Sequence, residues 1–561
     1  MPLCEKYFSH KGTKARFERF VFCTFNLIMR KYLFGLLVLI LALQSCKNSK
    51  ARRERAKRDA SISKVTSFNS LFFDSSHLDA FFEKNKQYEP FIEQFKDFYS
   101  DRNFQYAWFD SSGLAEQAYN FLNLHDGYIN EFNDSSLINK ELQVLVAKMT
   151  AQKIKASPND PEVIKTELLL TGQFFQYAAK VYKGSDIDAT QLGWYIPRKK
   201  IDLSALLDST IKTKAKEPDQ FAPLNPQYKK LEEQLSLYLG LEKKSATDSI
   251  AWVKKPLKIK DSSANISLIK QRLLLLGDMK TADNTTLFDS TLVLAAKSFQ
   301  KRMGLSIDGV IGNRMITELN VPVSKRIRQL LVNLERLRWM PAEKDSNYVV
   351  VNIPEYKLHV YDSGHQVFDM NVIVGTDANS TVIFKGRLKF VVFSPYWNVP
   401  PSIVKKEIIP GMSRNSNYLD KNNMEITGHS GGLPEVRQKP GLKNSLGLVK
   451  FLFPNNYNIY LHDTPNKELF SLSTRSFSHG CIRIGEPKKF AEYLLRSDKA
   501  WNSQTIDDAM HLAKEKWVTL DKTVPVFIVY FTAWVDSDGQ LNFRKDIYGH
   551  DEKMGEKLFA K

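Results

Sequence analysis

The spacing of apolar residues changes once along this 561-residue chain, near residue 346, and that change limits the folds open to it. Before it, apolar residues such as Leu114, Ala118 and Phe121 recur every three or four positions, which is the repeat of amphipathic helices. After it, short valine- and isoleucine-rich runs such as Tyr348–Asn352 and Val526–Phe531 have the composition of β-strands. We therefore predict a multidomain α+β protein, with helices first and a mostly-β domain last.

The helical part divides into a larger scaffold and a smaller module. Residues 78–250 carry helical repeats without a cluster of reactive side chains, so we predict a scaffold domain there. Residues 258–321 contain two apolar stripes that end at Gly277 and Gly304, as helices with glycine caps do, followed by a short third helix. A helix over 324–345 then connects this module to the β-rich part.

The β-rich domain is predicted over 346–535 and contains one long interruption. Residues 402–450 are rich in glycine, asparagine, proline and lysine, and a segment of this length inside a compact domain is usually a lid or a binding subdomain. Residues 536–561 are polar, and we expect them to form a mobile tail.

The first 46 residues have the pattern of an export signal. The apolar run Tyr32–Leu43 follows the basic pair Arg30-Lys31 and is too short for a membrane span, which needs about 20 residues. The run is followed by Cys46 in LQSC, which resembles a bacterial lipoprotein box whose cysteine is lipidated and becomes the mature N-terminus. We expect residues 1–46 to be a signal peptide, with Met29 rather than Met1 as the true start. An uncleaved anchor helix that extends back through residues 20–28 is the alternative.

The formal net charge of +18 is concentrated before the predicted domains. Residues 1–58 account for +11 of it, and the basic segment 47–58 begins a polar, flexible linker over 47–77. A basic segment beside a membrane anchor is attracted to anionic surface groups, so we expect a membrane rather than a nucleic acid as its partner. A solvated linker with incidental charge would have the same composition.

The sequence contains four cysteines, Cys4, Cys23, Cys46 and Cys481. If cleavage precedes Cys46, the exported protein keeps one lipidated cysteine and one free thiol, and no internal disulfide is possible. The free thiol of Cys481 then serves chemistry or is a buried, inert cysteine, and its neighbours distinguish the two.

Cys481 lies among residues that suit a nucleophile. A thiol attacks as the thiolate and therefore needs a base or a cation nearby. His479 lies two residues before it, and His462 lies nineteen residues before it, after a strand-like apolar run. Gly480 lets the backbone approach a reacting carbonyl, so that N–H groups there could hold an oxyanion, and Arg483 could clamp a carboxylate.

Each of these side chains also has a structural explanation. Lone histidines are more often structural residues, and Arg483 could form a surface salt bridge. A cysteine with two histidines could bind zinc, although tetrahedral sites usually show a clearer ligand pair, and the sequence has no CxxC or HExxH motif. Spacing alone leaves the enzymatic and structural interpretations open.

The residues around Cys481 follow a fixed spacing: His462, fifteen residues, SHGC, one apolar residue and Arg483. This spacing resembles the catalytic signature of L,D-transpeptidases with a YkuD-type domain. The chain is similar to the YcbB-type branch in YVVVNIPEYKLHVYD, FSPYWNVPPSIVKKEIIP and RSFSHGCIRI. Members of that branch combine a scaffold, a peptidoglycan-binding module and a lid-bearing catalytic domain. Within residues 258–321, the segment AAKSFQKRMGLSIDGVIGNRMITELN resembles the three-helix peptidoglycan-binding module of cell-wall enzymes. The resemblance covers roughly residues 80–535 and is strongest over 325–487.

The resemblance implies a role for each residue of the site. Cys481 would be the nucleophile, and His462 the general base, oriented by the backbone carbonyl of Asp463 rather than by its carboxylate. His479 and Gly480 would shape the oxyanion pocket. The residues that would contact the peptide substrate are Arg483, Tyr460, Trp397 and Ser478.

One departure from the family pattern concerns the loop that follows Gly375 in the β-domain. The family often has Thr-Pro after the turn at Gly375, whereas this chain has Thr381-Val382. The sequence therefore leaves open how that loop is held rigid.

The reaction implied by the resemblance is 3–3 cross-linking of peptidoglycan stem peptides through a Cys481 thioester, with release of terminal D-Ala and without a metal or cofactor. The same site could use water, as an L,D-carboxypeptidase, or a protein amine, as an attachment or detachment enzyme. A non-catalytic lipoprotein that tethers the membrane to the wall is the alternative of another class. We expect a periplasm-facing lipoprotein, on the outer membrane, and the sequence indicates no oligomeric state.

Overall fold

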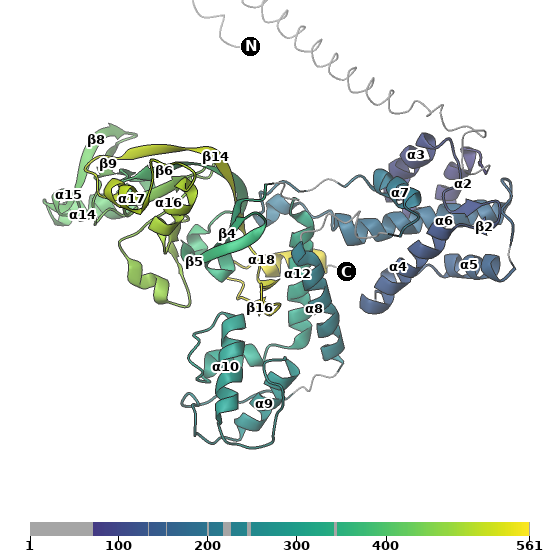
Figure 1. Ribbon diagram of the computed structural model, residues 1–561, viewed down its shortest axis with the longest axis horizontal. Helices are drawn as coiled ribbons and strands as arrows, with labels where there is room; N and C mark the ends of the chain where they lie inside the picture. The colour runs from purple at the N-terminus through teal and green to yellow at the C-terminus, as the bar shows by residue number, and fades with distance from the viewer. Residues whose placement is uncertain are drawn as a thin grey trace, which may run out of the picture. The chain divides into compact units, whose positions relative to one another are not determined.

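The computed structural model describes residues 71–559, except 133, 153, 199–200, 217–225, 244–247 and 342–344 (Figure 1). The expected signal peptide, the lipidation site at Cys46 and most of the 47–77 linker lie outside the described residues. The described residues form two compact units. The first comprises residues up to His125, Leu137–Gln176 and the segment that begins at Asp202, and the second comprises the rest. No helix among the described residues is long and apolar enough to cross a membrane.

The first unit is helical, as its apolar repeat predicts. Its helices are α2 (Ser76–Lys84), α3 (Ile92–Asp101), the start of α4 (Glu116–Phe132), α5 (Lys140–Gln152), most of α6 (Pro161–Ala178) and α7 (Leu203–Lys212), with a small hairpin of β1 (Phe109–Asp110) and β2 (Gly113–Leu114). Aromatic side chains dominate its core, with Tyr88, Phe95, Tyr99, Trp108, Phe121 and Phe175 at most 2% exposed.

One buried carboxylate organises this aromatic core. Glu167 is 0% exposed and accepts hydrogen bonds from the N–H groups of Ala107 (2.6 Å) and Trp108 (2.9 Å) and from the Tyr99 hydroxyl (2.9 Å). It therefore ties the chain beside β1 to α6 and α3, because a buried carboxylate is tolerated only where donors satisfy it.

The second unit contains a three-helix module where the sequence predicts one. Its helices are α9 (Asn265–Leu275), α10 (Ser290–Met303) and α11 (Asn313–Leu319). Asp289 caps α10 by accepting from the N–H of Leu292, and Gly304 ends it with a φ of +67°. A buried ion pair between Asp278 and Arg302 joins the turn after α9 to the end of α10.

The module continues into α12 (Val323–Trp339), which packs along α8 (Pro226–Glu242) and leads into the β-domain. This helix begins one residue before its predicted start. Its buried face is unusually polar and includes Asn333, Glu335 and Arg336.

The β-domain contains a nine-stranded sheet in the order β12-β5-β13-β11-β10-β6-β14-β3-β4, and β5 also pairs with β4, so the sheet closes on itself. Its strands are β3 (Tyr348–Asn352), β4 (Lys357–Asp362), β5 (His365–Gly375), β6 (Phe384–Phe393), β10 (Val449–Leu452), β11 (Leu461–His462), β12 (Ser476–Ser478), β13 (Ile482–Ile484) and β14 (Lys516–Val529). Two helices, α16 (Pro487–Leu495) and α17 (Ser503–Met510), separate β13 from β14. Of the two strand-like runs named from the sequence, Tyr348–Asn352 coincides with β3, whereas Val526–Phe531 extends two residues beyond the end of β14 at Val529.

The insertion between β6 and β10 has a core of its own. It contains α13 (Pro401–Ile403), a π-helical turn (Val404–Ile408), α14 (Ile409–Arg414), α15 (Tyr418–Lys421) and a three-stranded sheet of β7 (Trp397–Asn398), β9 (Leu433–Gln438) and β8 (Met424–Ser430). Its buried side chains are Val399, Val404, Ile408, Met424 and Val436. The segment is thus a small folded subdomain rather than a plain loop.

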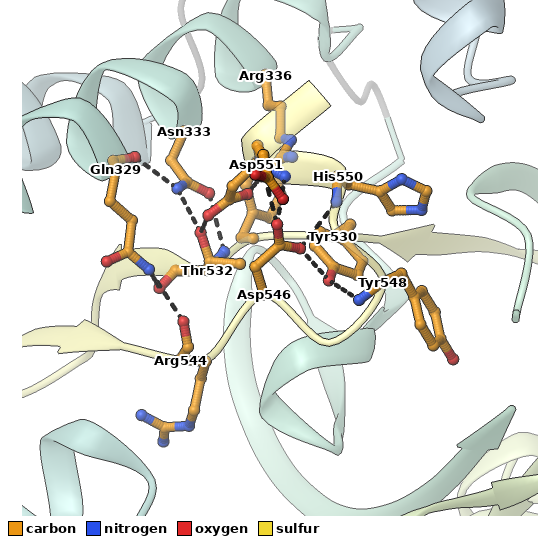
Figure 2. Close-up of polar contacts among 12 residues, drawn as sticks. Gln329, Asn333, Arg336, Tyr530, Thr532, Arg544, Asp546, Tyr548, His550 and Asp551 are labelled. Carbon is orange, nitrogen blue, oxygen red and sulfur yellow. Dashed lines mark hydrogen bonds and ion pairs between the residues drawn. The ribbon is translucent and has the colours of Figure 1, made fainter. Parts of the chain in front are cut away.

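The prediction of a mobile tail over 536–561 is wrong for the residues that the structure describes. Residues Leu541–Phe543 form β16, which pairs with β15 (Ala533–Val535), and His550–Leu558 form α18. Figure 2 shows polar contacts between this segment and α12: Thr532 exchanges hydrogen bonds with Asn333 (2.8 and 2.9 Å) and donates to Asp551 (2.5 Å). Some polar groups of the segment are paired with α12, as Asp551 is with Arg336, while others such as Glu552 and Lys553 are exposed, so its polar sequence does not by itself make it mobile.

Candidate active site

Cys481 lies at the end of a tight loop between β12 and β13. The strand β12 pairs in parallel with β5, whereas β13 pairs antiparallel with β5 and in parallel with β11, so the chain must reverse sharply between them. Gly480 makes this reversal with a φ of +111°, a backbone conformation that residues with a Cβ rarely adopt. Cys481 is the free cysteine of the described residues and is partly buried.

The register between β11 and β13 brings the predicted residues together. Leu461 pairs with Ile482 and His462 with Arg483, so Tyr460 lies across from Cys481. Alternate residues of a strand point to the same face, and therefore Tyr460, His462, Cys481 and Arg483 share one face of the sheet. The rings of Tyr460 and His462 are 5.6 Å apart.

The imidazole of His462 is buried and oriented by the backbone. It is 4% exposed, and its Nδ1 lies 2.5 Å from the Asp463 carbonyl oxygen, so that Nδ1 carries the proton and Nε2 is the unprotonated nitrogen. A backbone hydrogen bond with Leu446 also acts on the ring. Burial, followed by the nearby charge of Arg483, lowers the pKa of His462 to about 3. The imidazole is therefore neutral at pH 7.

The Asp463 carboxylate has other partners. It accepts from the N–H groups of Leu448 (2.8 Å) and Thr464 (2.7 Å) and pairs with Lys467. The expectation that the backbone carbonyl of this residue, and not its side chain, orients His462 agrees with this geometry.

The thiol of Cys481 is also neutral at rest. Burial raises its pKa, although hydrogen bonds from the backbone and side chain of Tyr460 and the charge of Arg483 act in the opposite direction. The Sγ atom lies 3.5 Å from the Asn458 carbonyl oxygen, to which a protonated thiol can donate. The pair is therefore a thiol beside a neutral imidazole.

Hydrogen bonds hold the Gly480 peptide groups on both sides. The Gly480 N–H donates to Ser478 Oγ (3.2 Å), which itself donates to the Cys481 carbonyl (2.5 Å). The Gly480 carbonyl accepts from Thr381 Oγ1 (2.8 Å). Ser478 thus stabilises the loop, and the Cys481 N–H has no acceptor among the residues that the structure describes.

Arg483 offers a cation that has no counterion among the described residues. It is partly buried, and its Nε is buried without a hydrogen-bond partner in the described part of the chain. Burial lowers the pKa of Arg483 from its ordinary value, but an arginine stays charged at neutral pH. A carboxylate on a ligand would satisfy this group.

The other two predicted side chains lie toward the insertion. His479 is exposed, with its Nε2 3.7 Å from Glu407 of the π-helical turn, and its backbone forms part of the catalytic loop. Trp397 lies on β7 and packs against the core of the insertion. No contact between Trp397 and Cys481 is found among the described residues.

Sequence reasoning missed Thr381 as part of the site. It is 1% exposed, and its Oγ1 accepts from the Gly375 N–H (2.9 Å) as well as donating to Gly480. The departure from Thr-Pro at residues 381–382 was the available signal, since it drew attention to the loop that this hydroxyl holds. In the described ranges, no group of three or more His, Cys, Asp or Glu side chains is placed to bind a metal ion.

Comparison with known families assigns most of the chain. Residues 346–518 match the YkuD family, described as "L,D-transpeptidase catalytic domain", residues 262–319 match the family "Putative peptidoglycan binding domain", and residues 93–235 match a "Scaffold domain". The match places the β-domain among transpeptidase catalytic domains. The chain therefore contains a YkuD-type L,D-transpeptidase catalytic domain, preceded by a peptidoglycan-binding domain.

Several proteins similar to this chain are named as L,D-transpeptidases. A curated protein of Haemophilus influenzae, "Putative L,D-transpeptidase", is 32% identical over 253 residues, which are 42% of this chain and 51% of that protein. The chain thus spans about half the length of this relative. Among solved structures, an L,D-transpeptidase from Stackebrandtia nassauensis is 16% identical, with 51% of this chain and 97% of that chain covered and a TM-score of 0.20. One from Mycobacterium smegmatis is 13% identical over 33% of this chain and 58% of that chain, with a TM-score of 0.18. At TM-scores this low, the structural similarity indicates nothing further about this protein.

Proposed function

We propose that this protein cross-links peptidoglycan by exchanging acyl groups between stem peptides. The reaction would form 3–3 cross-links through a thioester on Cys481 and release terminal D-Ala. The observation that supports it is the placement of Cys481 and His462 across adjacent strands, on one face, within the residues that match the L,D-transpeptidase catalytic domain.

The first half of the reaction follows from the protonation states at rest. As the Cys481 sulfur attacks the carbonyl carbon of the third stem residue, its proton passes to Nε2 of His462. The carbonyl oxygen becomes an oxyanion, which the unpaired Cys481 N–H is available to bind. The C–N bond to D-Ala then breaks, the leaving amine takes the proton from His462, and a thioester remains.

The second half regenerates the enzyme. An amine on the third residue of a neighbouring stem attacks the thioester carbonyl and gives its proton to His462. The C–S bond breaks, the sulfur recovers that proton as the thiol, and the new amide is the cross-link. Throughout, Arg483 would hold a carboxylate of the donor stem, because it is a partly buried cation without a counterion in the described residues. Tyr460, hydrogen-bonded to the thiol, would form one wall for the peptide.

Product analysis tests this proposal. The purified protein is incubated with tetrapeptide muropeptides, and the products are separated and weighed by mass spectrometry. We expect cross-linked dimers that have lost one D-Ala, and none with the Cys481→Ala variant, which should fold normally because it removes only one partly buried sulfur. Normal cross-linking by Cys481→Ala would refute the mechanism.

The same experiment separates the alternatives. Tripeptide products without dimers would indicate water as the acceptor, that is, an L,D-carboxypeptidase. A stem peptide joined to or released from a protein amine would indicate an attachment or detachment enzyme. Retained wall binding with no acyl transfer and no thioester would indicate a tethering lipoprotein.

We also propose that the protein faces the periplasm as a lipoprotein attached through Cys46. The support comes from the sequence around Cys46, which lies outside the described residues, and from the peptidoglycan-binding domain. Metabolic labelling with a radioactive fatty acid tests it: the wild type should be labelled, and Cys46→Ala should not.

A further inference from the structure

The direction of the Cys481 N–H is set by its neighbour's carbonyl. In a trans peptide, the C=O of one residue and the N–H of the next point in opposite directions. Thr381 Oγ1 accepts from the Gly375 N–H, so its single proton is directed at the Gly480 oxygen, 2.8 Å away. This hydrogen bond fixes one side of the Gly480–Cys481 peptide and leaves the Cys481 N–H pointing away from Thr381.

Thr381 is in turn held by a residue far along the chain. The Tyr548 hydroxyl donates to the Gly375 carbonyl (2.6 Å) and accepts from the Thr381 N–H (3.4 Å), so it bridges both ends of the loop over 375–381. That loop is closed so tightly that a Cβ on Gly375 would lie 2.0 Å from the Asn379 oxygen. The phenol donates as a neutral group, because burial raises the pKa of Tyr548 to about 12.

The backbone of Tyr548 is anchored by the polar contacts in Figure 2. Its N–H donates to the Tyr530 hydroxyl (2.9 Å), which donates to Asp546 (2.6 Å). Asp546 also accepts from the N–H groups of His550 (2.9 Å) and Asp551 (2.8 Å) at the start of α18. In the figure, the Tyr548 side chain points away from these contacts. Its hydroxyl donates to the Gly375 carbonyl. Tyr548 lies beyond residues 346–518, which match the catalytic-domain family.

We propose that Tyr548 is a positioning residue for acyl transfer: acting through Thr381, it aims the Cys481 N–H at the oxyanion that forms on the substrate. The inference rests on the proposed function, since an oxyanion forms only if Cys481 attacks a carbonyl. It makes a separate prediction, however. In the described part of the chain, Tyr548 bonds to the loop over 375–381 and to Tyr530 but not to the thiol or to His462, so its loss should impair acyl transfer without changing the reactivity of the thiol itself.

Two reactions of the same thiol distinguish these effects. Alkylation by iodoacetamide displaces iodide from a tetrahedral carbon and forms no oxyanion, whereas acyl transfer does. Tyr548→Phe should lower kcat at least about tenfold, because losing an oxyanion-hole donor outright costs about 10²–10³. KM for the stem peptide and the alkylation rate of Cys481 should stay within about twofold of the wild type.

Two sets of variants control for a loss of structure. Tyr493→Phe deletes a phenol that also donates to a backbone carbonyl, that of Tyr361 (3.3 Å), but has no bond to the loop over 375–381. It should leave kcat unchanged. At Thr381, serine keeps the hydroxyl and valine removes it, so Thr381→Ser should retain most of the kcat and Thr381→Val should lose it.

The outcomes separate this inference from the proposed function. A wild-type kcat in Tyr548→Phe, or parallel losses of kcat, alkylation rate and melting temperature, would overturn the positioning role. If Tyr548→Phe fails to fold, equal kcat values for Thr381→Ser and Thr381→Val would overturn it instead. A wild-type protein that alkylates but transfers no acyl group would refute the proposed function, and the inference with it.

Discussion

Replacing His462 by glutamine tests whether this histidine keeps Cys481 ionised at rest or acts only as a base during acyl transfer. A thiol protease-like site would hold a thiolate–imidazolium pair at rest, and the histidine would then be needed for any reaction of the sulfur. In the structure, burial lowers the pKa of His462 and raises that of Cys481, so the resting pair is neutral and the histidine is needed only as a base during acyl transfer. Glutamine can keep the hydrogen bond to the Asp463 carbonyl.

The magnitude follows from these pKa values. With a pKa of about 3, roughly one His462 in 10⁴ is protonated at pH 7. A thiol with a pKa above the usual value of about 8.5 is at most a few per cent thiolate at that pH. Because burial disfavours both charged forms, proton transfer from Cys481 to His462 is unfavourable at rest. Alkylation at pH 7 should therefore proceed through the free thiolate.

The assay follows iodoacetamide addition to the peptide that contains Cys481, by mass spectrometry, from pH 5 to pH 10. We expect one alkaline rise in both proteins, and rates at pH 7 that agree within about threefold, while His462→Gln loses acyl transfer by several orders of magnitude. A wild-type alkylation rate that is already maximal near pH 6 and falls 100-fold or more in His462→Gln would refute the neutral pair.

Three further predictions concern other parts of the molecule. Burial raises the pKa of Glu167 from 4.5 to about 7, so between these pH values the folded first unit binds more protons than the unfolded chain. Its free energy of unfolding should therefore fall as the pH rises from 4.5 to 7, by up to about 3 kcal/mol. Hydrogen exchange of peptides around residues 99–110, corrected for the intrinsic effect of pH, should show this decrease, and Glu167→Gln should abolish it. Arg483→Met should lower kcat/KM for stem peptides by about 10- to 100-fold, as expected for the loss of a charged hydrogen bond worth about 1.5–3 kcal/mol; an unchanged value would exclude Arg483 from substrate binding. Asp278 and Arg302 form an ion pair in which the two side chains are only 1% and 7% exposed, so Asp278→Asn leaves the Arg302 cation buried and unpaired. The substitution should destabilise the peptidoglycan-binding domain by about 3–5 kcal/mol. An unchanged melting temperature in calorimetry would contradict this estimate.

The sequence predicted the secondary structure best where the repeat was strong. The run Tyr348–Asn352 became β3 with the same bounds, and the helix predicted to begin at residue 324 begins at Val323. The C-terminal segment was mispredicted, because its polar residues carry no information about their partners. Asp546 and Asp551 are paired through contacts that form only when the chain has folded.

The candidate site was predicted in part. The motif around Cys481 identified Cys481, and its resemblance to a known family identified His462, which the register of β11 and β13 places across from Arg483. Thr381 and Tyr548 were not predicted, since they are 167 positions apart and neither belongs to the motif.

By itself, the sequence determined the order of domains, the strands and helices with clear apolar repeats, and the thiol, Cys481, that lies in a reactive motif. These features depend on local periodicity and composition, which can be read directly from neighbouring residues in the sequence. Only the tertiary structure decided the protonation states of Cys481 and His462 and the direction of the Cys481 N–H. Both depend on which groups surround an atom in space: burial removes the water that would stabilise a charge, and hydrogen bonds from distant residues orient a peptide group that the local sequence leaves free to rotate.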